Sequence, residues 1–241
     1  MTDAHESIYS LALETSGAHG GVALGRGPKI LRTGAFSGPR RHATELLPLL
    51  EALCSSAAVE PRSLGRVYVS AGPGSFTGLR IGITVARMLA LAAGAKIVAV
   101  PTLEVIAQNA AEALHPPDHL AVILDAKRKR AYAASFRRTD ALYAPTSAPA
   151  EINPDEFLSS QPPGCAIMGE GIAHHGAAVA ASGLRVLPRH LHAPRCEVVY
   201  QLGSARAARG LFDDPRTLIP IYIRPPEAEE KWEQKHKHAA P

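Results

Sequence analysis

The residues that best match a known kind of chemistry form a glycine-rich segment at 72–82, which reads GPGSFTGLRIG. An apolar run precedes this segment and a helical pattern follows it, so we expect it to join a strand to a helix. Glycine lets a backbone turn sharply, and the start of a helix offers unpaired N–H groups to an anion. The segment has neither the Walker A lysine nor the GxGxxG spacing. It is therefore either a phosphate site or a structural turn, and the turn is favoured.

Two carboxylates also stand where chemistry is often found. Glu14 ends the apolar run 8–13, and Asp125 ends a similar run at 119–124, close to half the chain later. Side chains at the carboxyl ends of strands often form sites in α/β proteins. Each carboxylate could orient a metal-bound nucleotide or accept N–H bonds within a turn, and the turn is favoured for both.

Other catalytic patterns are missing from the sequence. The 11 histidines are scattered without an HxxxH or HExxH pair, and the 3 cysteines are too widely spaced for a zinc motif. No GxSxG segment is present for a serine nucleophile. We therefore predict no catalytic residue and no metal site in this chain.

Composition and charge exclude several classes of protein. Apolar residues make up 46% of the chain, which argues against disorder, and aromatic residues only 5%, which disfavours a base-stacking platform for single-stranded nucleic acid. The apolar stretch 81–100 contains Arg87 and Lys96, and no signal pattern opens the chain, so we expect no membrane span and a cytoplasmic location. The net charge of +4 is mild, but it includes the run 127–130, KRKR. This run is either a solvated hairpin or an RNA phosphate contact.

The elements that must position these residues repeat along the chain. A strand–turn–strand–turn–strand pattern at 8–36 recurs at 119–143, with helices predicted at 42–58 and 77–93. This indicates an α/β protein with two related subdomains. We assign the N-terminal subdomain to 1–106, the second to 107–224, and a polar, partly disordered tail to 225–241.

The predicted helix after the glycine segment carries small residues on one face. Gly78, Gly82, Ala86 and Ala90 recur every four residues, a spacing that lets another helix approach closely. This face is either buried in the chain's own core or is a subunit interface.

Five segments occur in an order that resembles the TsaB (YeaZ) family. They are LALETS at 11–16, HATELLP at 42–48, the glycine segment 72–82, ILDA at 123–126 and PIYIR at 220–224. The resemblance implies the actin-like ATPase fold of sugar kinases, Hsp70 and actin, with two subdomains that each hold a mixed sheet flanked by helices. One departure is Glu14-Thr15, where the family commonly has Asp-Thr.

The resemblance also implies a function. It indicates a non-catalytic dimerisation subunit for threonylcarbamoyl transfer to the anticodon-adjacent adenosine of tRNAs that read codons beginning with A. The implied partners are a TsaD-like catalytic subunit and a TsaE-like ATPase, with a homodimer as the form of the isolated chain, and tRNA reached through the complex. The chain would have no cofactor of its own, with ATP or ADP at the shared interface. The alternatives are an ATP-dependent small-molecule kinase and a glycoprotease-like metallopeptidase.

Two sets of site residues follow from the resemblance. The nucleotide or phosphate loop would comprise Glu14, Thr15, Gly72, Gly74, Ser75, Thr77 and Gly78. The partner interface would use the two helices near the glycine segment, through His42, Leu46, Leu50, Leu79, Gly82, Ile83, Ala86, Arg87 and Ala90.

Overall fold

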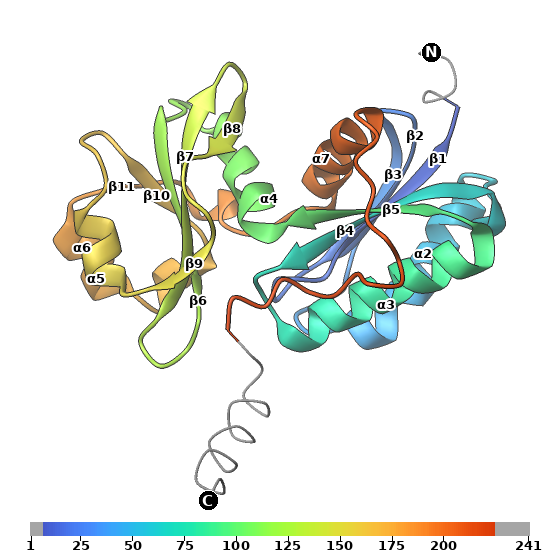
Figure 1. Ribbon diagram of the computed structural model, residues 1–241, viewed down its shortest axis with the longest axis horizontal. Coiled ribbons are helices and arrows are strands. Elements are labelled where there is room, and N and C mark those ends of the chain that lie inside the picture. The colour runs from blue at the N-terminus through green and yellow to red at the C-terminus, as the bar shows by residue number, and fades with distance from the viewer. Residues whose placement is uncertain (1–6, 225–241) are drawn as a thin grey trace, which may run out of the picture.

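The computed structural model describes residues 7–224, which form two lobes side by side (Figure 1). Each lobe is built on its own mixed β-sheet, and the helices cover the faces of these sheets. The predicted polar tail at 225–241 lies outside the described residues.

The first lobe contains a five-stranded sheet. Its strands are β1 (Tyr9–Glu14), β2 (Gly21–Arg26), β3 (Lys29–Ala35), β4 (Leu64–Gly72) and β5 (Lys96–Pro101), in the order β3-β2-β1-β4-β5. β1 pairs antiparallel with β2 and parallel with β4, and β4 pairs parallel with β5. Gly27 has a φ of 56° in the turn between β2 and β3, a conformation that favours glycine.

The second lobe repeats this topology. Its strands are β6 (His119–Asp125), β7 (Ala131–Thr139), β8 (Leu142–Pro145), β10 (Ala166–Met168) and β11 (Arg185–Val186), in the order β11-β10-β6-β7-β8, and β9 (Ala150–Ile152) pairs with β7. β6 pairs antiparallel with β7 and parallel with β10, as β1 does with β2 and β4. The predicted repeat is therefore confirmed, and the chain has the actin-like ATPase fold.

Helices cover both faces of the first sheet because its strands alternate between two cores. Leu11 and Leu13 face α2 (His42–Ser56) and α3 (Phe76–Ala93), which pack against each other. Ala12 faces the other side, where α7 (Cys196–Ala208) packs. This alternation is the period-2 pattern of a strand that is buried on both faces. The short helix η1 (Pro61–Ser63) leads into β4.

The second sheet is covered in the same way by shorter helices. They are α4 (Thr102–Gln108), η2 (Asn109–Glu112), α5 (Pro154–Ser159), η3 (Glu170–Ala173), α6 (Gly176–Ser182) and η4 (Arg189–Leu191). Leu120 and Val122 pack with α4, whereas Ala121 and Ile123 face the side of α5 and α6.

The end of the chain returns to the first lobe, which corrects the range 107–224 predicted for the second subdomain. In α7, Val199 and Tyr200 are buried with Ala12 and Tyr68 of the first sheet. The segment after α7 then follows the same lobe, where Asp213 N donates to Ile97 O (2.9 Å) and Ile221 N donates to Ala71 O (2.7 Å). The helix lies there because the first sheet has a second apolar face to cover. Figure 1 shows this segment crossing the first lobe.

In the part of the chain that the structure describes, one helix is long and apolar enough, by length and composition alone, to cross a membrane. This is α3, whose most apolar window has a mean hydropathy of 1.4 and is 33% buried. Core helices of soluble proteins meet the same criterion, and one face of α3 packs on β4.

Candidate functional site

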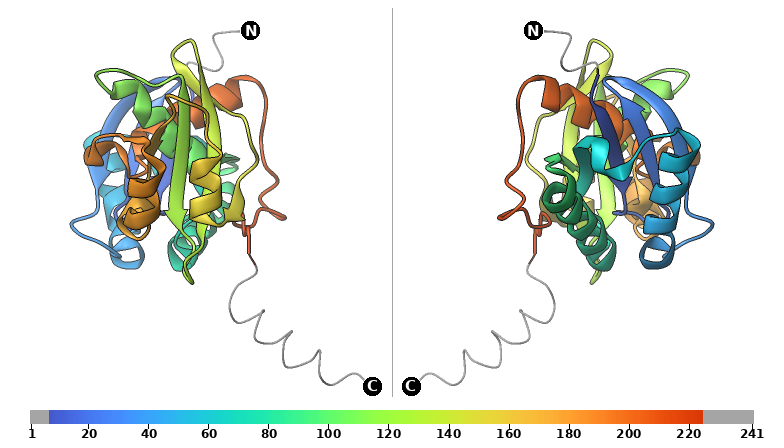
Figure 2. Two further views of the ribbon diagram at one scale, coloured as in Figure 1. Left: turned by 90° about the vertical axis from the view of Figure 1, so that its left-hand side faces the viewer. Right: turned by 90° about the vertical axis from the view of Figure 1, so that its right-hand side faces the viewer.

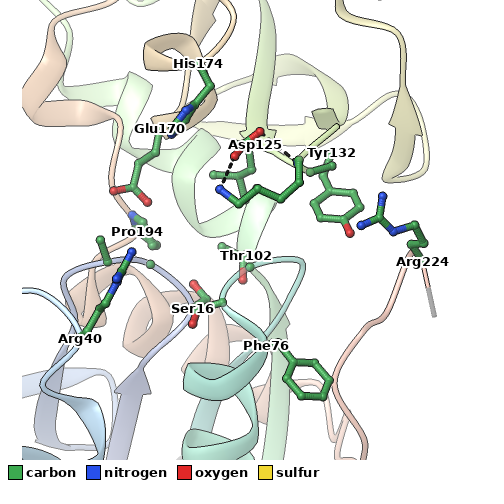
Figure 3. Close-up of a pocket in the computed structure, with 17 residues that line it drawn as sticks. Ser16, Arg40, Phe76, Thr102, Asp125, Tyr132, Glu170, His174, Pro194 and Arg224 are labelled. Atoms are coloured by element: carbon green, nitrogen blue, oxygen red, sulfur yellow. Dashed lines mark hydrogen bonds and ion pairs between the residues drawn. The ribbon is translucent and has the colours of Figure 1, made fainter. Parts of the chain in front are cut away.

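A cleft of about 480 Å³ lies between the two lobes, where the carboxyl ends of β1 and β6 approach each other. Figure 3 shows its walls, with Ser16 and Arg40 contributed by the first lobe and Asp125, Tyr132 and Glu170 by the second. Within residues 7–224, the cleft is lined by Ser16, Gly17, Ala18, Arg40, Gly74, Ser75, Phe76, Thr102, Leu124, Asp125, Ala126, Lys127, Tyr132, Glu170, His174, Pro194 and Arg224.

The carboxylate that ends β1 does not line the cleft. Glu14 is fully buried, and its Oε1 accepts hydrogen bonds from the N–H and the hydroxyl of Ser16, each at 2.6 Å. Its Oε2 accepts a hydrogen bond from the Ser70 hydroxyl. Burial raises the pKa of Glu14, although the bonds from Ser16 and Ser70 oppose this shift. Glu14 therefore has the turn role that the sequence favoured, and it holds the β1 turn against β4.

Part of the glycine segment is used for packing. Ser75 caps α3 by accepting a hydrogen bond from Gly78 N (3.2 Å), and Ser75 N donates to Ser16 O (2.7 Å). A Cβ on Gly74 would lie 2.5 Å from Ser16 O, and a Cβ on Gly78 would overlap Thr15 O. The glycines thus let the start of α3 lie directly on the turn after β1.

Most of the predicted nucleotide loop lies outside the cleft lining. Of its seven residues, only Gly74 and Ser75 line the cleft. Glu14, Thr15, Gly72 and Gly78 are buried, and Thr77 is exposed outside the cleft lining. The close approach of α3 to the turn after β1 buries Thr15 and Gly78, whereas Gly72 packs against Ile221 at the end of β4.

The carboxylate that ends β6 lies in the cleft. Asp125 accepts hydrogen bonds from Lys127 through its N–H (3.0 Å) and its ammonium group (2.6 Å), and His175 Nε2 lies 3.7 Å away. Partial burial alone would raise the pKa of Asp125, but the Lys127 bonds and charge, with His174, hold it below its ordinary value. Lys127 belongs to the hairpin between β6 and β7, so the basic run 127–130 forms a hairpin, as one of the two predictions from the sequence had it.

Several lining residues were missed by the sequence analysis. Figure 3 shows Glu170 and His174 on the wall of the second lobe, with the Glu170 carboxylate directed toward the first lobe. Burial raises the pKa of Glu170, and the charge of His19 opposes this. The Thr102 hydroxyl is buried without a hydrogen-bond partner among residues 7–224. A comparison of the two halves of the sequence would have drawn attention to Glu170, because Gly169-Glu170-Gly171 follows β10 as the glycine segment follows β4.

The predicted interface residues mostly pack inside this chain. His42, Leu46, Leu50, Leu79, Gly82, Ile83 and Ala86 are buried, whereas Arg87 is exposed and Ala90 is half-buried. Much of the small-residue face belongs to the chain's own core, because Gly82 lies against Thr15 and Val69. The outer surface of the two helices instead presents Leu47 (50% exposed), Met88 (50%) and Leu91 (84%).

Comparisons with known proteins identify the family. The family model described as "TsaD: tRNA N6-adenosine threonylcarbamoyltransferase" matches residues 37–232. A Bacillus subtilis protein named "tRNA threonylcarbamoyladenosine biosynthesis protein TsaB" is 27% identical over 240 residues, covering 94% of this chain and 99% of the relative. The chain belongs to the TsaB (YeaZ) family.

Further members of this family agree with that assignment. The Escherichia coli TsaB is 34% identical over 102 residues, which cover 42% of this chain and 44% of the relative. The structure titled "YeaZ from Pseudomonas aeruginosa" superimposes with a TM-score of 0.77 at 26% identity, covering 89% of this chain and 99% of that one. Within residues 7–224 of this TsaB-family chain, no group of three or more His, Cys, Asp or Glu side chains could hold a metal ion.

Proposed function

We propose that this chain takes part in tRNA threonylcarbamoyladenosine biosynthesis in the cytoplasm as a non-catalytic subunit. It pairs with a TsaD-like subunit, which transfers the threonylcarbamoyl group to the anticodon-adjacent adenosine, and it works with a TsaE-like ATPase. The proposal is supported by the similarity over nearly the full chain to a protein named for this pathway. The name of the matching family model supports the choice of a TsaD-like partner.

The observation that carries the pairing role is the outer surface of α2 and α3. Leu47, Met88 and Leu91 are large apolar side chains at least half exposed on two helices that pack against each other. Large apolar side chains left exposed on two neighbouring helices favour a protein interface over a solvated surface. A second copy of the chain could use the same helices, so we expect a homodimer when the partner is absent.

The non-catalytic role is supported by the state of the two carboxylates. Glu14 is enclosed by Ser16 and Ser70, and Asp125 is paired with Lys127. A carboxylate whose pKa is held low is a weak base, so Asp125 is poorly suited to deprotonating a substrate hydroxyl, as the alternative kinase would require. Any ATP or ADP would then be held at the surface shared with the partner, as the family resemblance implies.

The test is reconstitution with TsaD-like and TsaE-like proteins, with this chain included or omitted. We expect tRNA modification only when it is included, and unchanged activity without it would contradict the proposal. Met88→Glu and Leu91→Glu should each weaken binding to the TsaD-like subunit by about thirtyfold or more, the size of an interface hot spot. Pull-down and size-exclusion chromatography would measure this binding.

Matched variants separate pairing from folding. Leu114 is 89% exposed on the second lobe, so Leu114→Glu should leave pairing unchanged. Ile83 and Ala86 are 3% and 0% exposed, so Ile83→Glu or Ala86→Glu should unfold the chain and cannot report on an interface. Normal pairing by both Met88→Glu and Leu91→Glu would show that this surface is not the interface.

A further inference from the structure

An aromatic pair stands beside the mouth of the cleft, although the sequence contains few aromatic residues. The rings of Phe76 and Tyr222 lie 5.6 Å apart at 33°, and the Arg80 guanidinium lies 4.3 Å from the centre of the Phe76 ring. Arg80 Nε also donates to the Tyr222 hydroxyl at 3.2 Å. Phe76 is 42% exposed, so much of this braced ring is accessible from outside.

Basic side chains surround this pair. Arg40, Lys127 and Arg224 line the same cleft as Phe76, and Arg128 and Lys129 are exposed at the tip of the β6–β7 hairpin. Figures 1 and 2 both place this hairpin tip and the start of α3 at the same end of the molecule, one on each lobe.

Carboxylates pair with some of these basic side chains. Asp125 is paired with Lys127, and Glu151 lies 3.5 Å from Arg130 and 3.6 Å from Arg224. Among residues 7–224, the other carboxylate that lines the cleft is Glu170, on the wall of the second lobe.

We propose that this face binds single-stranded RNA, with a base stacked on Phe76 and phosphates held by the basic hairpin tip. Exposed rings next to a basic groove are the features with which proteins hold single strands, because every base has a face that can stack. An arginine that braces the ring adds a planar cation beside the stacked base. The inference deepens the proposed function, on which it rests, by giving the chain its own contact with the unpaired part of a tRNA.

The test is fluorescence anisotropy with the full-length chain and a labelled oligoribonucleotide of about 12 nucleotides, within the range of single-strand sites. Lys129→Glu should weaken binding at low salt by about fivefold or more and reduce the salt slope by about 0.7, because one phosphate contact is lost. Arg137→Glu is the matched control, since Arg137 is exposed at the opposite end of β7 and should bind RNA normally.

A second variant tests the stacking contact separately. Phe76→Leu keeps an apolar side chain at the start of α3, and we expect about tenfold weaker binding with an unchanged salt slope. Equal effects of Lys129→Glu and Arg137→Glu, or no binding at low salt, would overturn the proposal. The proposal would also be overturned if poly-glutamate displaced the RNA and Phe76→Leu bound RNA with full affinity. The surface would then suit an acidic protein segment.

RNA binding and pairing with the TsaD-like subunit can be tested separately. Lys129→Glu should pair normally with the TsaD-like subunit, whereas Met88→Glu should fail to pair but bind RNA normally. If the chain is required for tRNA modification while Lys129→Glu and Phe76→Leu bind RNA as the unaltered chain does, the RNA contact is wrong and the pairing role stands.

Discussion

The two lobes end their first strands differently, although they share one topology. In both lobes a glycine lies against the end of the first strand. This glycine belongs to the segment that follows β4 in the first lobe and β10 in the second. Gly78 approaches Thr15 O after β1, and Gly169 approaches Ile123 O at the end of β6. The carboxylates then diverge, because Glu14 is sealed inside the first lobe and Asp125 lies in the cleft.

The difference follows from what each turn supplies. The turn after Glu14 supplies Ser16 and β4 supplies Ser70, so the carboxylate accepts its hydrogen bonds from donors inside the first lobe. The chain after Asp125 turns straight back into β7 and offers Lys127 from an exposed hairpin. A repeated fold therefore preserves the position of a carboxylate without preserving its role, which the adjacent turn decides.

Replacing each carboxylate should give the largest difference in stability between the two lobes. Glu14→Ala leaves the Ser16 and Ser70 donors unpaired in the core, and we expect a loss of about 3 kcal/mol in the free energy of unfolding. Asp125→Ala removes a pair whose lysine side chain is 74% exposed, so the loss should stay below about 1 kcal/mol. Urea denaturation would measure both, and equal losses would contradict the assigned roles.

The glycine contact at the first strand end should have the next largest effect. In Gly78→Ala, the new methyl group must displace the Thr15 carbonyl, and we expect a loss of about 2 kcal/mol despite alanine's better helix propensity. Gly176→Ala, at the start of α6 where nothing lies within 4 Å of the added carbon, should change stability by less than about 0.5 kcal/mol. Thermal denaturation of the two variants tests this contrast, and a neutral Gly78→Ala would show that the turn is loosely packed.

The smallest effect is a difference in pH dependence between the carboxylates. The folded pKa of Glu14 lies above 4.5, so its stabilising contribution falls as the pH rises from 4.5 through that raised value. The folded pKa of Asp125 lies below 3.8, so its contribution is present above 3.8 and is lost as the pH falls through the lowered value.

Unfolding free energies of the unaltered chain, Glu14→Gln and Asp125→Asn between about pH 3 and pH 7 would measure this difference. The unfolding free energy of the unaltered chain minus that of Glu14→Gln should decrease with rising pH. The same difference for Asp125→Asn should increase. Slopes of the same sign would show that the two carboxylates have similar surroundings.

The strand pattern was enough to predict the repeated architecture, because the apolar runs 8–13 and 119–124, each followed by a carboxylate, are local properties of the chain. The destination of α7 was not predictable in the same way, since Val199 and Tyr200 are apolar and suit either lobe. The helices predicted at 42–58 and 77–93 are confirmed as α2 and α3, but the pattern of small residues did not reveal which face pointed outward. Gly78 and Gly82 serve close packing on Thr15, a contact between segments more than 60 residues apart.

The return of α7 to the first lobe has a consequence for synthesis on the ribosome. When β1–β5 have emerged, the helix that covers one face of their sheet has not yet been translated, because residues 196–208 come after the whole second sheet. The apolar face around Ala12, Tyr68 and Val98 stays bare while the second lobe is made. The lobe that is synthesised first is thus completed only after the second lobe, and the nascent chain depends on α7 to cover it.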